Sequence, residues 1–358
     1  MLIGQGTASR YVFLDYLRAL AAWLVVWDHL ANIVPAMQGR SFAPAQFVQD
    51  NFAVPLGMIQ DFGWFGVALF FLISGFIISD RASVESARQF LVRRVLRIYP
   101  MLAVAVLLST LLVATKDQIT IRNVLLNMTL ANYLVLPQIV LVGAAWTLVV
   151  EMMFYALTAA TQAARTSPHR IGANLLFIAL VIWKARAFGS QFFLVAAAAC
   201  YLPVLVMGQT VYWWLVRRRL SALWGLAYLL GAYGVFLYGL RSVLPAFLPV
   251  TNSYLVSVTY ALLLFITLLH VKVPERRVVR FLSDTSYSMY LLHGIIGWSL
   301  LLALMPRMSL WLAIPLAMAA SLAAAYMTYR LVELPGQRLA RRLTRKRQDP
   351  DLPTTAAP

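Results

Sequence analysis

Charged residues and cysteine are both scarce in this chain of 358 residues. Only 12% of the residues are charged and 61% are hydrophobic, and the mean hydropathy is +0.76. A soluble domain needs more polar surface than this, so the composition excludes a soluble globular protein and a disordered chain. The single cysteine, Cys200, excludes an intrachain disulfide, and no cysteine–histidine cluster has the spacing of a zinc site. We therefore expect neither metal nor redox chemistry.

The pattern of a cleavable signal peptide is also missing, because no basic segment and small-residue cleavage site flank the first apolar run. That run, residues 11–34, carries Asp15, Arg18, Asp28 and His29. We interpret it as a retained membrane helix that bears functional residues.

Apolar windows recur along the chain at about the 20 residues that cross a bilayer as a helix. They fall at residues 11–34, 63–80, 98–115, 143–163, 171–185, 192–216, 221–240, 253–271, 285–304 and 310–331. The sequence predicts an all-α polytopic membrane protein of about ten transmembrane helices. We expect one membrane domain over residues 11–335 and a basic, then disordered, cytoplasmic tail over 336–358. The apolar stretch 124–142 is either an eleventh span or a re-entrant or surface segment.

The formal net charge of +17 would, in a soluble protein, suggest a nucleic-acid partner. In the ten-span arrangement, however, 23 of the 30 lysines and arginines fall on the side of the two termini. Cytoplasmic loops carry such an excess. The charge therefore predicts a membrane protein with both termini in the cytoplasm, in contact with anionic lipid and not with nucleic acid.

Ionisable residues inside a span cost several kcal/mol, about 2.5–3.5 on insertion scales, so they usually face the protein interior or a water-filled cavity. Arg18 and His29 are eleven positions apart, which places them on one helix face about three turns from each other. Glu151 shares a face of the fourth span with Thr147 and Tyr155. These groups are candidates for chemistry, although polar residues also join helices in bundles.

In the ninth span, Ser286, Tyr290 and His293 share a face by the same periodicity. For His293, a structural role and a functional role are equally good interpretations. After the second span, Arg93, Arg94 and Arg97 form a compact guanidinium cluster at i, i+3 and i+4 spacing. Guanidinium groups suit phosphate, so the cluster could hold a phosphorylated cytoplasmic ligand, but membrane-orientation charge also explains arginines here.

Six segments resemble the acyltransferase 3 family of integral membrane O-acyltransferases, and they extend from about Tyr11 to Pro335. They are LDYLRALAA (14–22) with His29, FFLISGF (70–76), RRVLRIYP (93–100), WTLVVEMMFY (146–155), SYSMYLLH (286–293) and ELP (333–335). Two positions depart from the family pattern: Tyr16 replaces the usual glycine, and Asp28 precedes the histidine. The resemblance implies transfer of an acyl group, most often acetyl, from cytoplasmic acyl-CoA to a hydroxyl of an envelope or exported carbohydrate or glycolipid.

Carried over by position, His29 would be the catalytic histidine and Glu151 the acid of the fourth-span motif. Glu151 would orient the His29 ring, steady its protonated form or bind sugar hydroxyls. The remaining expected donor-binding and substrate-binding residues are Arg18, Arg93, Arg94, Arg97, Tyr99, Ser74, Trp146, Tyr155, Tyr290 and His293. Arg18 would bind the acyl-CoA head or stabilise the oxyanion, and Tyr99 would stack on the adenine. Acyl-CoA enters as co-substrate, and no permanently bound cofactor is expected.

Two routes fit these roles. Donor and acceptor meet in a cavity entered from opposite sides, with His29 as general base, or an acyl-enzyme forms first. We favour direct transfer, because no serine or cysteine has an evident nucleophile arrangement. The rival classes are a proton-coupled transporter, with His29 and Glu151 as a relay, and a flippase or scaffold for a glycan precursor. The transporter leaves the arginine cluster and the ordered set of motifs unexplained, and the flippase or scaffold predicts no activity in isolation.

Overall fold

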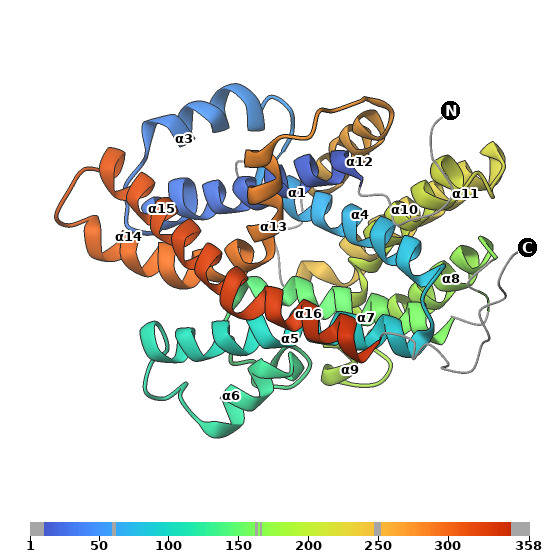
Figure 1. Cartoon of the computed structure of the whole chain (residues 1–358), viewed down its shortest axis with the longest axis horizontal. Helices are drawn as coiled ribbons and strands as arrows, with labels where there is room; N and C mark the ends of the chain where they lie inside the picture. Colours follow the sequence, from blue (N-terminus) through green and yellow to red (C-terminus); the bar gives the residue numbers. More distant parts are fainter. Residues whose placement is uncertain (1–10, 59–61, 162–163, 165–166, 247–251, 345–358) are drawn as a thin grey trace, which may run out of the picture.

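The computed structural model describes residues 11–58, 62–161, 164, 167–246 and 252–344, and these residues form helices joined by short connections (Figure 1). Nine helical runs in this part of the chain are long and apolar enough to cross a membrane. They are Val12–Met37, Gly63–Ala82, Ala87–Leu112, Gly143–Ala160, Ser190–Val216, Ala222–Ala246, Ser253–His270, Arg277–Leu304 and Leu310–Leu343. A shorter apolar helix, Arg170–Trp183, lies at the predicted fifth span. The predicted all-α polytopic membrane fold is confirmed.

The individual helices have these bounds: α1 Val12–Trp27, α2 Val34–Met37, α3 Ala43–Val48, α4 Gly63–Ala82, α5 Ala87–Leu112, α6 Ile121–Met128, α7 Trp146–Ala160, α8 Arg170–Trp183, α9 Ser190–Ala199, α10 Leu202–Val211, α11 Ala222–Ser242, α12 Ser253–His270, α13 Arg277–Leu292, α14 Trp298–Leu304, α15 Leu310–Thr328 and α16 Leu334–Leu343. Several of them continue into their neighbours through π-helical turns, so one membrane run can contain two or three labelled helices.

Helix α4 lies at the centre of the bundle, where it packs against α1, α10 and α12. Glycines permit its close contact with α10. A Cβ atom at Gly75 would lie 1.8 Å from the carbonyl oxygen of Leu205, and one at Gly208 would lie 2.1 Å from that of Leu72. Lipid offers no hydrophobic drive for helices to associate, so small residues that allow backbones to approach are a main source of packing energy in membranes.

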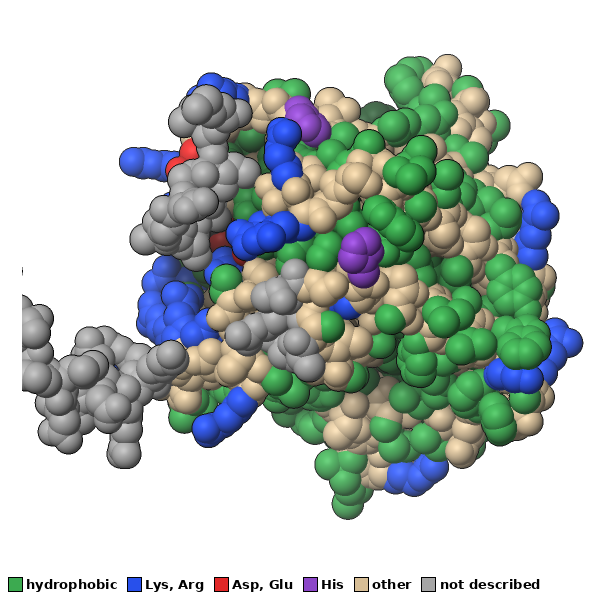
Figure 2. Space-filling view, turned by 90° about the vertical axis from the view of Figure 1, so that its right-hand side faces the viewer, with side chains coloured by type: hydrophobic (Ala, Val, Ile, Leu, Met, Phe, Trp, Pro, Cys, Tyr) green, Lys and Arg blue, Asp and Glu red, His purple; other side chains and the backbone are tan. Residues whose placement is uncertain are grey.

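Hydrophobic side chains cover much of the outer surface, as a membrane protein requires (Figure 2). On the face shown, lysine and arginine side chains gather most densely toward the left of the view. Large apolar side chains such as Leu111, Leu230 and Trp311 are strongly exposed in the isolated chain. Lipid is the natural solvent for such a surface.

Two π-helical turns interrupt the membrane helices at the histidines of the candidate site. One covers Asp28–Ile33 between α1 and α2, and the other covers His293–Gly297 between α13 and α14. A π-turn inserts an extra residue into a helix and re-aims the side chains around it, and such turns are frequent at functional sites. Each turn changes the side-chain phase between the helical segments before and after it.

The segment 124–142 does not form an eleventh span. It consists of the end of the short helix α6, a 3₁₀ turn at Ala131–Tyr133 and extended chain. Asn127 holds it together by donating to the Asn123 and Ile139 carbonyls and accepting from the Leu141 amide. A buried asparagine that binds three backbone groups favours a folded loop over a membrane helix.

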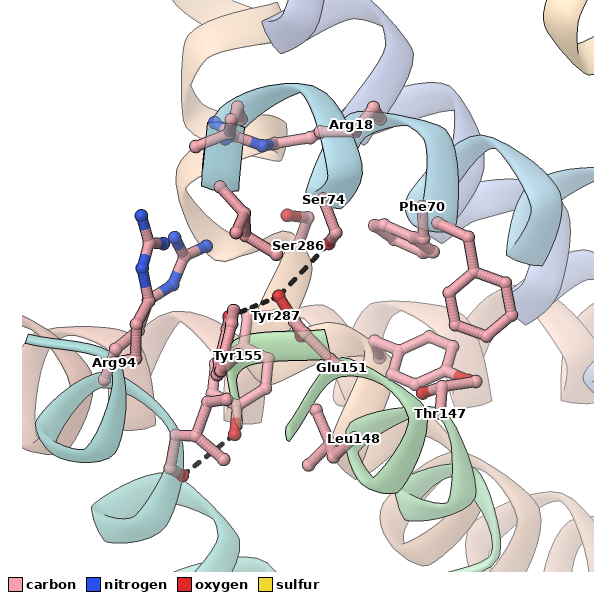
Figure 3. A pocket seen from close by; sticks show the side chains of 17 residues that line it. Arg18, Phe70, Ser74, Arg94, Thr147, Leu148, Glu151, Tyr155, Ser286 and Tyr287 are labelled. Atoms are coloured by element: carbon pink, nitrogen blue, oxygen red, sulfur yellow. Dashed lines mark hydrogen bonds between the residues drawn. The ribbon is translucent and has the colours of Figure 1, made fainter. Parts of the chain in front are cut away.

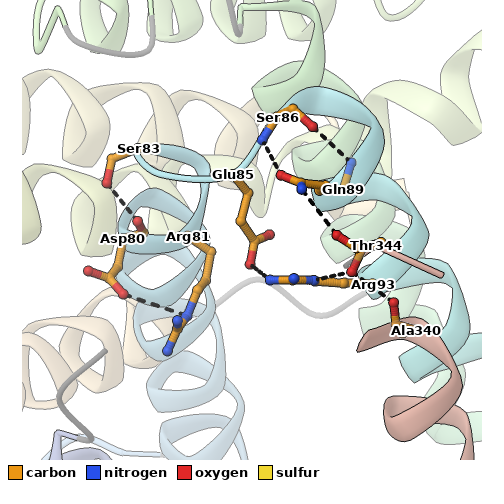
Figure 4. Close-up of polar contacts among 9 residues, drawn as sticks. All are labelled: Asp80, Arg81, Ser83, Glu85, Ser86, Gln89, Arg93, Ala340 and Thr344. Carbon is orange, nitrogen blue, oxygen red and sulfur yellow. Dashed lines mark hydrogen bonds and ion pairs between the residues drawn. The ribbon is translucent and has the colours of Figure 1, made fainter. Parts of the chain in front are cut away.

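The predicted domain boundary after Pro335 falls within helix α16, Leu334–Leu343. Helix α16 continues to Leu343 and packs against α5. Gln89 Nε2 donates to the Thr344 carbonyl at 3.2 Å, and Arg93 Nε donates to its hydroxyl at 2.8 Å (Figure 4). Residues 345–358 of the expected tail lie outside the described residues.

Candidate active site

Four cavities with shared lining residues lead from the arginine cluster to His29. The first, a mouth of about 490 Å³, is lined by basic and acidic side chains from α1, α4, α5, α13 and α16. Arg18, Arg94 and Arg97 line it and also line a second, narrow cavity of about 80 Å³. Arg94 is buried, with its guanidinium carbon 5.4 Å from the ring centre of Phe90 and 5.6 Å from that of Tyr155. The aromatic faces fix a cation at the entrance.

Glu151 on α7 lies in the narrow cavity (Figure 3). Its carboxylate accepts hydrogen bonds from Ser74 Oγ on α4, at 3.1 Å, and from the hydroxyl of Tyr155 one turn along its own helix. A carboxylate inside a membrane protein needs such donors to offset its lost hydration. The narrow cavity is therefore a polar constriction built by helices α1, α4, α5, α7 and α13.

Tyr290 connects the constriction to the next cavity, because it lines both. Its hydroxyl lies 3.1 Å from Oγ1 of Thr147. Beyond it, a third cavity of about 470 Å³ is lined by His29, Asp28 and several aromatic side chains, namely Trp64, Tyr133, Trp146, Tyr201, Tyr254 and Tyr290. Trp64 and Trp146 lie nearly parallel, with ring centres 6.3 Å apart and an interplanar angle of 10°. We call this space the aromatic cavity.

The wall of the aromatic cavity includes residues of the segment 124–142, for which the sequence allowed either an eleventh span or a re-entrant or surface segment. Tyr133 donates to the Val142 carbonyl at 2.7 Å, and Gln138 Nε2 donates to the Tyr133 carbonyl at 2.8 Å. Burial raises the pKa of Tyr133, so its hydroxyl keeps the proton that it donates. Residues 140–144 also line a fourth cavity of about 260 Å³, together with His29 and His293.

His29 and His293 contact each other directly. Nδ1 of His29 lies 2.7 Å from Nε2 of His293, and the ring centres are 4.8 Å apart. Nδ1 of His293 lies 3.2 Å from the carbonyl oxygen of Met289, which can only accept. His293 therefore carries its proton on Nδ1, and its Nε2 accepts from Nδ1 of His29. This chain of hydrogen bonds leaves Nε2 of His29 as an unprotonated ring nitrogen with a free lone pair.

The structure places the predicted site residues at different levels along the series of cavities. His29, His293 and Trp146 line the cavities beyond the constriction, whereas Arg18, Arg94 and Arg97 line the mouth and the constriction. Ser74, Glu151 and Tyr155 lie between them, and Tyr290 faces both sides. The hydrogen-bond partner of the His29 ring is thus His293 and not Glu151.

Two predicted donor-binding residues have other surroundings. Arg93 lines the mouth, but its guanidinium donates to Glu85 at 2.7 Å and to Thr344 at 2.8 Å, so it joins the α4–α5 turn to the end of α16 (Figure 4). Tyr99 packs against the hydrophobic core and is not among the residues that line the four cavities.

Sequence reasoning did not find Trp64, Tyr201 or Tyr254, which line the aromatic cavity. These aromatic residues occur in apolar segments, where aromatic side chains occupy lipid-facing and core positions alike. Only the packing shows that the three share a cavity. Asp28 was noted as unusual. It is 2% exposed, and a Cβ atom at Gly63 would lie 2.2 Å from its Oδ2, so glycine is needed to admit the carboxylate.

Among the described residues, no group of three or more histidine, cysteine or carboxylate side chains is placed to hold a metal ion. A family model described as an acyltransferase domain matches residues 11–330 of the chain. No curated protein and no solved structure gives a significant match.

Proposed function

The chain belongs to the acyltransferase 3 family, and from this premise we propose that it moves an acyl group, acetyl by default, from acyl-CoA to a hydroxyl of an envelope or exported carbohydrate. It is a membrane acyltransferase. In the proposal, acyl-CoA is the donor at the arginine-lined mouth, and the acceptor occupies the aromatic cavity. The observation that carries this assignment is the series of shared lining residues that leads from Arg97 through Tyr290 to His29.

The mouth suits the nucleotide end of the donor. Six arginines line it, and guanidinium groups bind phosphate with two parallel hydrogen bonds. The narrow cavity beyond is too small for a nucleotide but suits the thin arm that carries the thioester. Ser74, Thr147 and the Glu151 carboxylate would bind the amide groups of that arm. The thioester would then reach the region of Tyr290 and His29.

His29 would act as the general base. Its Nε2 takes the proton from the acceptor hydroxyl while that oxygen attacks the thioester carbonyl carbon. The carbon–sulfur bond then breaks, the proton passes to the departing thiolate, and the ester and free CoA are the products. During attack the positive charge on His29 is shared with His293 through the 2.7 Å hydrogen bond. General base catalysis of this kind contributes roughly 10²–10⁴ in rate.

The aromatic cavity supports a carbohydrate acceptor. Aromatic rings with polar edges suit a ligand that has both apolar ring faces and hydroxyl groups. The Trp64 indole nitrogen donates to the Tyr254 carbonyl at 3.2 Å, which fixes the ring plane. Asp28 and Gln138 line the same cavity and could accept or donate bonds to hydroxyls.

Direct transfer fits the geometry better than an acyl-enzyme. The donor path and the aromatic cavity meet at Tyr290, so both substrates can approach His29 from different sides. An acyl-histidine would have to form at the same nitrogen that serves as base. We further propose that the arginine-lined mouth faces the cytoplasm of a bacterial inner membrane, since acyl-CoA is a cytoplasmic compound and the excess of basic residues lies on this side.

The test uses the full chain purified in neutral detergent and acetyl-CoA labelled in the acetyl group. We expect slow release of labelled acetate without acceptor, and none from a folded His29→Ala variant. A transporter or scaffold would release none in either case. Mass spectrometry of envelope glycans from cells with and without the gene would then identify the acceptor by an acyl increment. The proposal would be refuted if the folded chain turned over none of the acyl-CoA donors tried, with or without any of the glycans as acceptor.

A further inference from the structure

A second polar site lies between α8 and α10, away from the cavities that lead to His29. Arg170, the first residue of α8, is only 4% exposed, yet its Nε, Nη1 and Nη2 atoms have no hydrogen-bond partner among the described residues. No residue of α8 lines any of the four cavities. An ionised guanidinium without an acceptor is among the most costly groups to bury. The described residues supply no acceptor for these bonds, so the site is open to a bound ligand that does.

Other unsatisfied polar groups accompany Arg170. Asn174 lies one turn along the same face of α8, is 1% exposed and has neither amide atom paired within the described chain. Among the described residues, Gln209 on α10 is fully buried with both amide atoms unpaired, and Trp213, one turn beyond it, has an unpaired indole nitrogen. Helix α8 packs against α10 (Figure 1), and the Arg170 guanidinium carbon lies 5.8 Å from the Trp213 ring centre.

The chemistry of these groups selects an anion. Guanidinium, two amides and an indole together offer many N–H donors, and among the described residues no carboxylate forms an ion pair with Arg170. A cation would be repelled by Arg170, and an uncharged ligand would leave the guanidinium charge unpaired. An oxyanion with several acceptor oxygens satisfies both needs, and phosphate matches the guanidinium fork best.

The depth of the site favours phosphate as well. Helix α7 runs from Trp146, at the aromatic cavity, to Tyr155, at the constriction, so α8 begins on the side of the arginine-lined mouth. The hydroxyl of Tyr212, the neighbour of Trp213, lies 3.3 Å from that of Ser83 in the α4–α5 turn on the same side. We propose that Arg170, Asn174 and Gln209 bind the phosphate group of a phospholipid or a free phosphate at this level of the membrane.

The experiment follows the melting midpoint of the full chain in neutral detergent. One arm adds inorganic phosphate at constant ionic strength, and the other adds phosphatidylglycerol, with diacylglycerol as the lipid that lacks phosphate. A ligand that binds only the folded state raises the midpoint once its concentration exceeds its dissociation constant. We expect one of the two phosphate-bearing probes to do so, and the responding arm identifies the source.

Arg170→Met keeps the length of the side chain but removes its charge and donors. It should raise the dissociation constant obtained from the midpoint shifts by roughly tenfold or more, since charged hydrogen bonds are the strongest in the set. The matched control is Arg219→Met, which removes an exposed arginine on the same side and should leave the response unchanged. If Arg170→Met does not yield folded protein, Asn174→Leu should weaken the response in the same direction. The proposal would be overturned if the unmodified chain responded to neither probe. It would also be overturned if Arg170→Met and Asn174→Leu both responded as strongly as the unmodified chain.

Discussion

Nδ1 of His29 lies 2.7 Å from Nε2 of His293, so two residues 264 positions apart share one hydrogen bond at the centre of the candidate site. The Met289 carbonyl fixes the proton positions along this pair. The arrangement is similar in logic to a base whose orientation is set by a second group, although here the second group is neutral. We therefore expect His29 to act as the base and His293 to position its ring, and mutation can distinguish these two roles.

Replacement of His29 by alanine should abolish transfer while acyl-CoA still binds. The imidazole is needed when the hydroxyl proton leaves, and the arginine-lined mouth that would hold the donor is unchanged. We expect a loss of roughly 10²–10⁴ in kcat. The measurement is acyl transfer together with calorimetric binding of CoA. Near wild-type transfer by His29→Ala would contradict the role assignment.

The unmodified enzyme should lose activity as pH falls, because protonated His29 cannot accept the hydroxyl proton. On the acid side kcat/KM should fall by about tenfold per pH unit once the imidazole titrates. Initial rates at saturating donor across pH 4–9 test this, with protein stability followed in the same buffers. A flat profile would exclude a titrating base.

His293 should act by positioning the His29 ring. His293→Gln keeps an oxygen near the Nε2 position that can accept from His29 Nδ1, whereas His293→Leu cannot accept. We therefore expect leucine to lower kcat by roughly a hundredfold and glutamine to restore most of it, with the KM for donor unchanged in both. A purely structural role predicts instead that both variants lose stability and that glutamine gives no selective recovery of kcat.

Arg94 and Arg97 should determine the affinity for the donor. Alanine at either position should raise the KM for acyl-CoA by about tenfold, more than it raises the KM for acceptor, and Arg97→Lys should restore only part because lysine lacks the fork. Arg88→Ala, an exposed position on the same helix, is the control. Arg93→Ala should mainly lower the melting midpoint, since Arg93 joins Glu85 to Thr344. Equal donor KM values in all four alanine variants would return the cluster to orientation charge.

Topology provides the last prediction. Val84 in the α4–α5 turn is 71% exposed, and Ser309 before α15 is also exposed. Val84 follows one membrane run and Ser309 precedes another, and the ten-span prediction puts them on opposite sides of the membrane. Cysteines at these positions in a Cys200→Ser background should react oppositely with an impermeant thiol reagent applied to intact cells. We expect Ser309→Cys to react from outside and Val84→Cys only after lysis. Labelling of both from outside would refute ten crossings.

The sequence by itself determined the class of fold and the candidate positions for chemistry along the chain. Apolar windows of bilayer length define the spans because a chain in lipid must satisfy its backbone within each helix. Ionisable residues within those spans, His29 and Glu151 among them, were identifiable because an ionisable group in lipid costs free energy and is therefore rare there. Such local signals need no knowledge of which helices are neighbours.

Only the tertiary structure decided which of these groups meet. Helical periodicity placed Arg18 on the stripe of His29, but the packing assigns Arg18 to the mouth and pairs His29 with His293 across the bundle. The π-helical turns at both histidines change the side-chain phase between the helical segments on their two sides, and no propensity in the sequence marks them. The aromatic cavity and the Arg170 site likewise arise from contacts between helices. In a membrane, contacts of this kind depend on small residues and shape more than on hydrophobic pattern, because nearly every span has the same pattern.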